Sequence, residues 1–260
     1  FEVFISIFVK KNIYMKIFKT QQIQLLDQYT IEQEPVSSIK LMERAADALF
    51  EAYTETFGFN RPVLIFAGPG NNGGDALALA RKLLKINIDI KVILMKGNKV
   101  STNCEINKNR LLEINGEIFE EQNKQFVAPE LKSNTLIIDG LFGSGLSRPL
   151  DGIYKDAIRW INSSNCEILS IDIPSGLQGE NNPDIATPIV KAHQTFSLQF
   201  AKLTFLLPES GVFVGDWTIL NIGLHPRAIA QTDTNYFLVS KTDVQKFLKK
   251  RSRFSHKGTY

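Results

Sequence analysis

The sequence predicts an α/β fold with a mostly parallel, doubly wound sheet that helices cover on both faces. Short apolar runs typical of buried strands alternate with helix-like segments along the chain. Polar, glycine-bearing segments follow three of these apolar runs directly. With 260 residues, 43% of them apolar, the chain can bury one substantial core.

The elements follow in a regular order. A helix is expected from Thr20, because Ile23 and Leu26 recur at helical spacing, and a second helix is expected to begin near Ser37 or Ser38. Further helices are expected over residues 76–86, 102–114 and 152–162. Strands are expected over residues 63–67, 90–95, 135–139, 167–172 and 191–196. Two shorter strands, 217–222 and 236–239, are expected to extend one edge of the sheet.

Composition excludes several classes of function. The net charge is only +3, and Lys and Arg are interspersed with Asp and Glu, so nucleic acid is not an expected partner. No apolar run is long enough to cross a membrane. Cys104 and Cys166 lie far apart without C-x-x-C spacing, which fits a reducing cytoplasm and excludes a zinc site.

The first motif is Gly68-Pro69-Gly70-Asn71-Asn72-Gly73-Gly74-Asp75, between a strand-like run and a helix-like run that begins at Ala76. Glycines let the backbone approach a ligand, and a helix start attracts anions, so we expect an anionic ligand here. The motif contains G-x-G-x-x-G, but the next strand ends at Lys96-Gly97, without the acidic residue that binds ribose in NAD-dependent dehydrogenases. A glycine-rich turn with no ligand is the alternative.

Two further motifs follow strands. One runs from Asp139 through Gly-Leu-Phe-Gly-Ser-Gly-Leu-Ser to Arg148-Pro149, and the other is Asp172-Ile-Pro-Ser175-Gly-Leu. Each Asp taken singly could be a cap or turn former. Because parallel strands present their carboxyl ends at one edge, the three motifs are expected to converge on one site. Their oxygen ligands would suit a hard cation. Arg148 could bind a phosphate, and the alternative is an arginine in a solvated loop.

The three motifs, in this order and spacing, resemble the N-terminal YjeF domain, the NAD(P)H-hydrate epimerase, over about residues 15–240. The resemblance implies a Rossmann-like three-layer α/β/α sandwich, commonly a homodimer. It also implies an isomerase that interconverts the R and S epimers of hydrated NADH or NADPH, a nucleotide repair activity.

The resemblance also implies roles for individual residues. Asp172 would be the catalytic acid–base residue, and Lys202 would be a second catalytic residue that faces the site, although its neighbours Gln199 and Leu203 depart from the usual small-residue context. The potassium ligands would be Asn72, Asp139 and Ser175. The substrate-binding residues would be Asn71, Asn72, Gly73, Gly74, Asp75, Gly143, Ser144, Gly145, Leu146, Ser147, Arg148, Pro149 and Asp172.

Both ends of the chain lie outside this domain. Residues 1–14 are interpreted as upstream translation, an expression remnant or an extra edge segment, with Met15 as the start. Residues 241–260 are interpreted as a linker and the truncated start of a fused dehydratase domain, because 251–260 resemble the opening of the ADP- or ATP-dependent NAD(P)H-hydrate dehydratase. We therefore expect epimerisation without nucleotide-driven dehydration. A basic disordered tail is the alternative for 251–260.

The chemistry suggests a mechanism for the expected reaction. Inversion at a ring carbon next to nitrogen is easiest if the hydroxyl leaves with a proton and water returns to the other face. The hypothesis assigns the proton to Asp172, orientation of the ring to Asp75 or Lys202, and contact with substrate phosphate to potassium near Asp139. The rival hypotheses are a non-catalytic YjeF-type binding or scaffold module and, third, a plain dehydrogenase.

Overall fold

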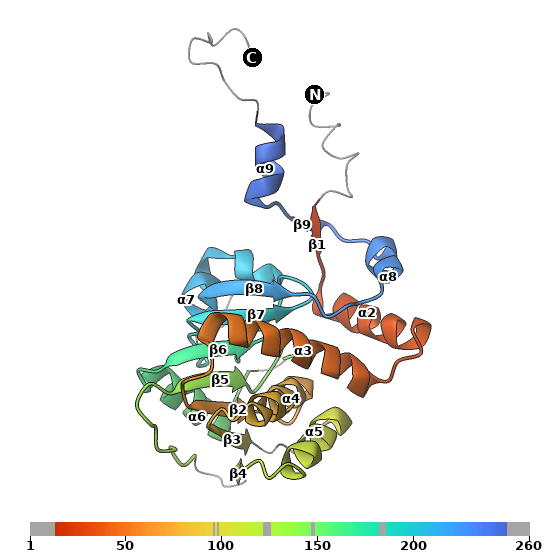
Figure 1. The fold of residues 1–260 in the computed structure, drawn as a ribbon. Helices are drawn as coiled ribbons and strands as arrows, with labels where there is room; N and C mark the ends of the chain where they lie inside the picture. Colours follow the sequence, from red (N-terminus) through yellow and green to blue (C-terminus); the bar gives the residue numbers. More distant parts are fainter. Residues whose placement is uncertain are drawn as a thin grey trace. The chain divides into compact units, whose positions relative to one another are not determined.

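A computed structural model of the chain describes residues 14–95, 97, 99–121, 126–146, 149–181 and 186–248 (Figure 1). The expectations for residues 1–13, Lys96, Ser147, Arg148 and 249–260 lie outside these described residues. The described residues divide into two compact units, one within residues 18–233 and the other of residues 14–17 with 234–248.

The larger unit contains a seven-stranded sheet in the order β4-β3-β2-β5-β6-β7-β8, and every neighbouring pair is parallel. This confirms the predicted fold class. The strands are β2 (Val63–Ala67), β3 (Ile90–Met95), β4 (Ile118–Glu121), β5 (Leu136–Gly140), β6 (Glu167–Ile171), β7 (Gln194–Leu198) and β8 (Asp216–Leu220).

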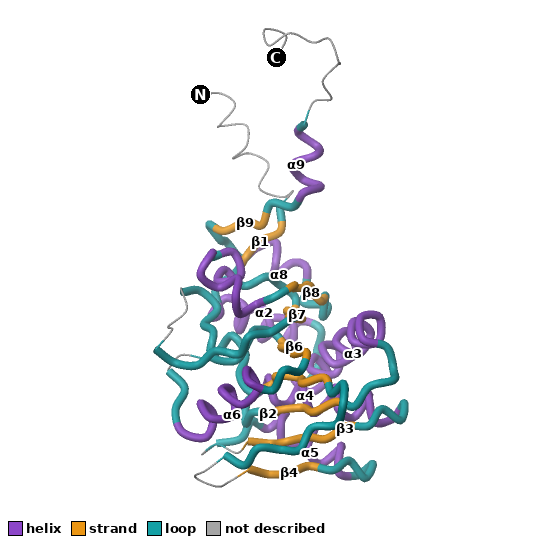
Figure 2. The backbone as a smooth tube through the Cα atoms, turned by 90° about the vertical axis from the view of Figure 1, so that its left-hand side faces the viewer, coloured by secondary structure: helices purple, strands orange, loops and turns teal. Residues whose placement is uncertain are grey.

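Helices cover both faces of this sheet (Figure 2). The helices are α2 (Thr20–Gln33), α3 (Ser38–Phe57), α4 (Asn71–Lys85), α5 (Thr102–Leu112), α6 (Gly152–Ser163), α7 (Gly211–Val214) and α8 (Pro226–Gln231), with the 3₁₀ turns η1 (Leu203–Leu206) and η2 (Pro208–Ser210). α3, α4 and α5 contribute buried side chains to one face, and α6 contributes them to the other. The arrangement is therefore a three-layer sandwich.

The central strand β2 shows how the sequence produces three layers. Val63, Ile65 and Ala67 pack on the α3–α4–α5 side, whereas Leu64 and Phe66 pack on the α6 side. Side chains alternate between the faces of a strand, so a continuous apolar run fits only a strand that is covered on both sides. All five residues of β2 are buried.

The strand order reverses between β2 and β5. From β2 the chain proceeds outward to β3 and β4, and it then returns to the other side of β2 and continues through β5 to β8. β2 and β5 are adjacent, and the chain leaves their carboxyl ends toward opposite sides of the sheet. Such a reversal leaves a crevice at the carboxyl ends, where ligands bind in open α/β sheets.

Several expected elements differ in position. The helix expected from Ala76 begins at Asn71, so Asn71–Asp75 form its first turns and not a loop. β4 was missed, because its two apolar residues are adjacent and two acidic residues follow them, so Ile118–Glu121 shows no alternating apolar pattern. The strand expected over 191–196 is Gln194–Leu198, and the preceding residues lead into it.

The smaller unit is described by itself. Its strands β1 (Met15–Ile17) and β9 (Tyr236–Leu238) pair antiparallel, so the expectation that 236–239 extends the main sheet was wrong. The Thr234 hydroxyl donates to the Ile17 carbonyl at 2.6 Å. Helix α9 (Lys241–Phe247) begins with a capping box between Ser240 and Asp243. No helix within the described ranges has the length and hydropathy needed to span a bilayer.

Close backbone contacts fix the loops of β2 and β5 to each other. A Cβ atom on Gly68 would lie 1.8 Å from the Leu141 carbonyl oxygen, and one on Gly73 would lie 1.8 Å from the Gly68 carbonyl oxygen. Both distances are far below van der Waals contact. Glycine is therefore required at both positions by packing, independently of any ligand.

We predict that Gly68→Ala lowers the free energy of unfolding by at least about 2–3 kcal/mol, because the backbone at Leu141 must move. Gly70→Ala is the matched control, since nothing lies within 4 Å of a Cβ at Gly70. Urea denaturation of both variants checks this. Equal stabilities for the two variants would contradict the packing argument.

Candidate active site

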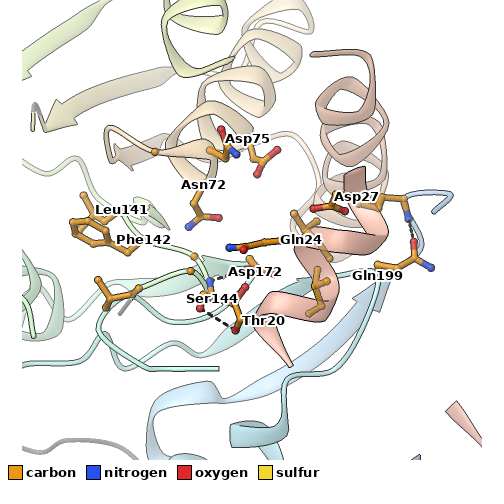
Figure 3. Close-up of a pocket in the computed structure, with 18 of the residues that line it drawn as sticks. Thr20, Gln24, Asp27, Asn72, Asp75, Leu141, Phe142, Ser144, Asp172 and Gln199 are labelled. Carbon is orange, nitrogen blue, oxygen red and sulfur yellow. Dashed lines mark hydrogen bonds between the residues drawn. The ribbon is translucent and has the colours of Figure 1, made fainter. Parts of the chain in front are cut away.

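A cavity of about 450 Å³ lies at the carboxyl ends of the central strands (Figure 3). Its walls come from five regions: the start of α4 after β2, residues 141–146 after β5, the ends of β6 and β7, one face of α2, and Ile222 and Leu224 after β8. The first two regions flank the point where the strand order reverses. The cavity therefore occupies the crevice that the topology creates.

Asp172 is the first residue after β6, and two loops depend on its carboxylate. One oxygen lies 2.6 Å from the Lys202 ammonium, and the other accepts the backbone N–H of Ser144 at 3.0 Å. Burial opposes ionisation of this carboxyl, but Lys202 and the hydrogen bonds from Lys202 and Ser144 outweigh it, so the pKa of Asp172 lies below its ordinary value. Asp172 is therefore ionised at neutral pH.

The Lys202 side chain is only 2% exposed. Besides its ion pair, its ammonium donates to the Ser197 hydroxyl at 3.1 Å and to the carbonyls of Leu198 and Phe200 at 3.2 and 3.1 Å. A buried ammonium with four oxygen partners has little rotational freedom. Lys202 thus holds Asp172 in one position from beneath the cavity.

Two residues at the strand ends adopt left-handed backbone conformations. Asp172 has φ +66° and Gln199, directly after β7, has φ +61°. Both line the cavity. The Gln199 side chain accepts the backbone N–H of Ile222 at 2.9 Å. Non-glycine residues in this region are uncommon and concentrate at functional sites, so these two conformations support a functional assignment for this edge.

Asp139 lies behind the cavity wall. It is fully buried, and its carboxylate accepts hydrogen bonds from the Ser170 hydroxyl at 2.8 Å and from the Ser175 N–H and hydroxyl at 2.8 and 2.5 Å. The Ser175 hydroxyl in turn accepts the backbone N–H of Phe142 at 2.9 Å. Burial raises the pKa of Asp139, and these hydrogen bonds oppose the rise. Within the described residues no cation pairs with Asp139.

Asn72 presents an unsatisfied amide to the cavity. It is 7% exposed, and neither its side-chain oxygen nor its nitrogen has a hydrogen-bond partner in the part of the chain that the structure describes. Its side chain lies near Gly143, whose added Cβ would be 3.4 Å from the Asn72 Cβ. Burying an amide without partners is costly, so a ligand or cation is expected to satisfy it.

Asp27 and Asp75 bring two further carboxyl groups to the cavity (Figure 3). Burial and the charge of Asp172 raise the pKa of Asp27 to about 7, although the nearby Lys202 ammonium opposes the rise. Burial and the charges of Asp172 and Asp27 hold the pKa of Asp75 well above its usual range. The site therefore combines one ionised carboxylate with two carboxyl groups that retain protons more strongly.

The structure brings many of the predicted site residues together. Asn71, Asn72, Asp75, Asp172 and the loop Gly143–Leu146 line the cavity. Gly73 and Gly74 do not line it: their absent side chains make room for the Gly68 carbonyl and for Met42, respectively. Pro149 is also outside the described lining, and Asp139, Ser175 and Lys202 support it from behind.

Sequence reasoning missed the wall that α2 provides. Thr20, Gln24 and Asp27 line the cavity at helical spacing i, i+4 and i+7. The Thr20 N–H donates to Glu180 at 2.5 Å, and its hydroxyl donates to the Ser144 carbonyl at 3.2 Å. The polar stripe was visible in the sequence, but nothing in the sequence placed this helix beside the carboxyl ends of the strands.

Fold and site together define a class of protein: a three-layer α/β protein with an acid–base cavity at its topological switch point. The family model described as "YjeF-related protein N-terminus" matches residues 38–204. The chain belongs to this family, which confirms the resemblance seen in the motifs.

Named relatives agree with the family. The chain is 34% identical over 209 residues to a protein of Oenococcus oeni named NAD(P)H-hydrate epimerase, covering 79% of this chain and 96% of the relative. It is 31% identical over 249 residues to a protein of Thermofilum pendens named bifunctional NAD(P)H-hydrate repair enzyme Nnr, covering 95% of this chain and 47% of the relative. The chain thus spans about half the length of such bifunctional relatives.

A solved structure shares the fold. The crystal structure of yeast ynu0 superimposes with a TM-score of 0.61 at 21% identity, and the match covers 73% of this chain and 83% of that one. At this identity the likeness concerns the fold alone. It places the three-layer arrangement of this chain among known architectures.

We predict that Lys202→Met destabilises the protein by about 3 kcal/mol or more at pH 7, because it leaves Asp172 as a buried, unpaired charge. In the wild type the lowered pKa of Asp172 makes the pair stabilising above about pH 4, and acidification through that pKa removes the contribution. Without Lys202 the pKa of Asp172 rises, so the deficit of the variant should shrink between pH 7 and pH 5.

Denaturant titrations of both proteins at these two pH values test this. Asp156→Asn is the control, because the Asp156–Arg159 pair is exposed and such pairs contribute under about 1 kcal/mol. A deficit that stays constant with pH would show that the charge of Asp172 is not its cause.

Proposed function

We propose that this chain interconverts the two epimers of hydrated NADH and NADPH, as an isomerase of nicotinamide nucleotide repair. The observation that carries the proposal is the ionised Asp172 facing a cavity beside carboxyl groups that retain protons. Inversion at a carbon bearing a hydroxyl next to nitrogen needs proton donors and acceptors, and redox chemistry is unnecessary. The names of the relatives in Oenococcus oeni and Thermofilum pendens support the same activity.

In this proposal the walls of the cavity bind different parts of the substrate. The start of α4 offers unpaired backbone N–H groups, which suit the phosphates of a dinucleotide. Residues 143–146 form a backbone-lined wall that Asp172 fixes through Ser144. Asp172 is then positioned to accept a proton from the water that adds to the substrate ring. A non-catalytic binding module would need no such set of carboxyl groups.

We also propose a potassium ion held by Asn72, Asp139 and Ser175. Two features fit the ion: the Asn72 amide oxygen lacks a protein partner, and the buried Asp139 carboxylate lacks a cationic one within the described residues. Oxygen ligands of this kind suit a hard cation. When bound, the ion would supply positive charge that compensates Asp139 and attracts substrate phosphate.

The oligomeric state, the cellular location and the fused domain are also proposals. We propose a homodimer that acts in the cytoplasm and, in a full-length protein, beside a fused dehydratase domain. The motif resemblance supports the dimer and the fusion, and the bifunctional relatives of about twice this length also support the fusion. The separate cysteines Cys104 and Cys166 support a reducing cytoplasm. Light scattering of the purified protein tests the dimer.

We predict that the protein interconverts a purified single epimer and that Asp172→Asn lowers kcat by at least about 100-fold, because an amide keeps the shape but cannot accept the proton. Chromatographic separation of the two epimers over time is the measurement. Asp216→Asn, an exposed change at the start of β8, is the matched control and should retain the wild-type rate.

Two outcomes would decide against these assignments. A wild-type protein that leaves a single epimer unchanged would overturn the proposed function. A folded Asp172→Asn protein with normal turnover would instead remove Asp172 from the reaction. Circular dichroism of each variant establishes folding.

For the potassium site we predict a higher melting temperature in potassium chloride than in choline chloride at equal ionic strength, since an ion that binds only the folded state stabilises it. Each kcal/mol should raise the midpoint by about 2–4 °C for a chain of this size. Asn72→Leu should abolish the difference between the two salts. Identical melting of the wild type in both salts would contradict the site.

A further inference from the structure

The cavity contains one acidic side chain, Asp27, to which the proposed function assigns no individual role. Asp27 lies on α2, before the residues that the family model matches. It is partly exposed and lines the cavity from the α2 side, with Asp75 on α4 and Asp172 after β6 on other sides (Figure 3). Three carboxyl groups thus surround one space.

The α2 wall is held in place at its first turn. Thr20 bonds to Glu180 through its N–H and to the Ser144 carbonyl through its hydroxyl, at 2.5 and 3.2 Å. Ser144 in turn donates its N–H to Asp172 at 3.0 Å. One short chain of hydrogen bonds therefore connects the helix that bears Asp27 to Asp172, and it fixes the two carboxyl groups relative to each other.

The Asp27 carboxyl is free to serve a ligand. Among the described residues it has no hydrogen-bond or ion-pair partner, whereas Asp172 has Lys202 and Ser144. A carboxyl group that faces a confined cavity without a partner loses hydration and gains nothing in the free protein. A substrate hydroxyl would supply the missing hydrogen bond.

The charged groups that shift the pKa of Asp27 are Asp172, which disfavours its ionisation, and the Lys202 ammonium, which favours it. Asp75 also faces the cavity, and the charge of Asp27 helps to raise the pKa of Asp75. Burial and Asp172 raise the pKa of Asp27 to about 7, while the pKa of Asp172 is lowered. At neutral pH a proton on Asp27 therefore coexists with an ionised Asp172. Two carboxyl groups whose environments separate their pKa values form an acid–base pair.

We propose that Asp27 is a second proton-transfer residue of this site, and that it protonates the departing hydroxyl of the substrate while Asp172 accepts a proton from the water that adds to the opposite face. The proposal rests on the proposed epimerisation. It assigns a role to α2, which neither the sequence motifs nor the matched family segment includes.

The step balances in atoms and electrons. The carbon–oxygen bond of the hydrate breaks as the ring nitrogen lone pair forms a carbon–nitrogen double bond, and the oxygen leaves as water with the proton from Asp27. A second water then adds to the other face, the double bond returns its electrons to nitrogen, and Asp172 takes the released proton. The proton returns from Asp172 to Asp27 through solvent, so nothing is oxidised or reduced.

Asp75 is less suited to this role. It is 7% exposed, and its pKa is held well above its usual range by burial and by the neighbouring acidic groups of Asp172 and Asp27. An acid that holds its proton so strongly is a poor donor near neutral pH, because catalytic efficiency is greatest when the pKa lies near the working pH. Its carboxyl group can instead form a hydrogen bond with bound substrate.

The experiment measures kcat and KM for epimerisation of a single hydrate epimer from pH 5.5 to 9 in the wild type, Asp27→Asn, Asp27→Glu and Glu32→Gln. We expect Asp27→Asn to lose at least about 100-fold in kcat with little change in KM. The wild-type rate should fall above about pH 7 as Asp27 loses its proton, and this fall should disappear in Asp27→Asn. Glu32→Gln removes an exposed carboxylate from the same helix and should match the wild type.

Stability provides a readout that a structural role would move in the opposite direction. The raised pKa means that ionised Asp27 destabilises the folded protein as the pH rises, so Asp27→Asn should melt at the wild-type temperature or above it at pH 8. A large loss of turnover in a protein of equal or greater stability supports proton transfer by Asp27. Recovery of part of the rate and of the alkaline fall in Asp27→Glu supports it further.

The contrary outcomes are separable. An Asp27→Asn protein with the wild-type rate and the same fall above pH 7 overturns the role of Asp27 alone, as does an Asp27→Glu protein that is folded and no more active than Asp27→Asn. Failure of the wild type to epimerise the hydrate overturns the proposed function first and the role of Asp27 with it.

Discussion

The buried ion pair between Asp172 and Lys202 is the interaction on which the site depends. It ties the loop after β6 to the segment after β7, and the second Asp172 oxygen holds the loop after β5 through Ser144. Three loops that leave neighbouring parallel strands are thereby fixed by one carboxylate. A buried pair of this kind contributes little net stability, but loss of either partner is costly. Its value here lies in fixing positions, and the left-handed backbone of Asp172 is tolerated because these bonds retain it.

The proposed reaction uses the same geometry. Thr20 extends the hydrogen-bond chain from Ser144 to α2, so that the helix bearing Asp27 is connected to the loop that Asp172 organises. Proton transfer is efficient only when donor and acceptor groups are held within hydrogen-bonding reach of the reacting atoms. A helix and two strand ends supply more rigid supports than free loops would. The hydrogen-bond chain therefore links the fold of the sheet edge to the chemistry proposed for the cavity.

The sequence predicted the layers and the edge of the sheet where the site lies, because apolar runs and the aspartates that follow them are local signals. β2 and β3 coincide with their predicted ranges. The sequence did not predict which strands pair with each other. β9 has strand composition, but it pairs with β1 and not with the main sheet. The role of Gly74 depends on Met42, which is distant in sequence, and the contribution of Asp27 depends on how α2 docks. Those contacts arise only from tertiary packing, which no short motif encodes.

The charges of the site explain why protons and a cation belong together in it. Four carboxyl groups lie in or directly behind the cavity, those of Asp27, Asp75, Asp139 and Asp172, and Lys202 is the ammonium that pairs with one of them. Burial makes simultaneous ionisation of all four unfavourable, since each charge would lose hydration and repel the others. Asp27 and Asp75 reduce this cost by keeping protons, whereas Asp139 already accepts hydrogen bonds from Ser170 and Ser175 and is better compensated by a positive charge. Protonation of Asp27 and binding of potassium beside Asp139 would thus both reduce the cost of burying several negative charges. Of the two, only the proton, which can leave near neutral pH, can take part in inversion of the substrate.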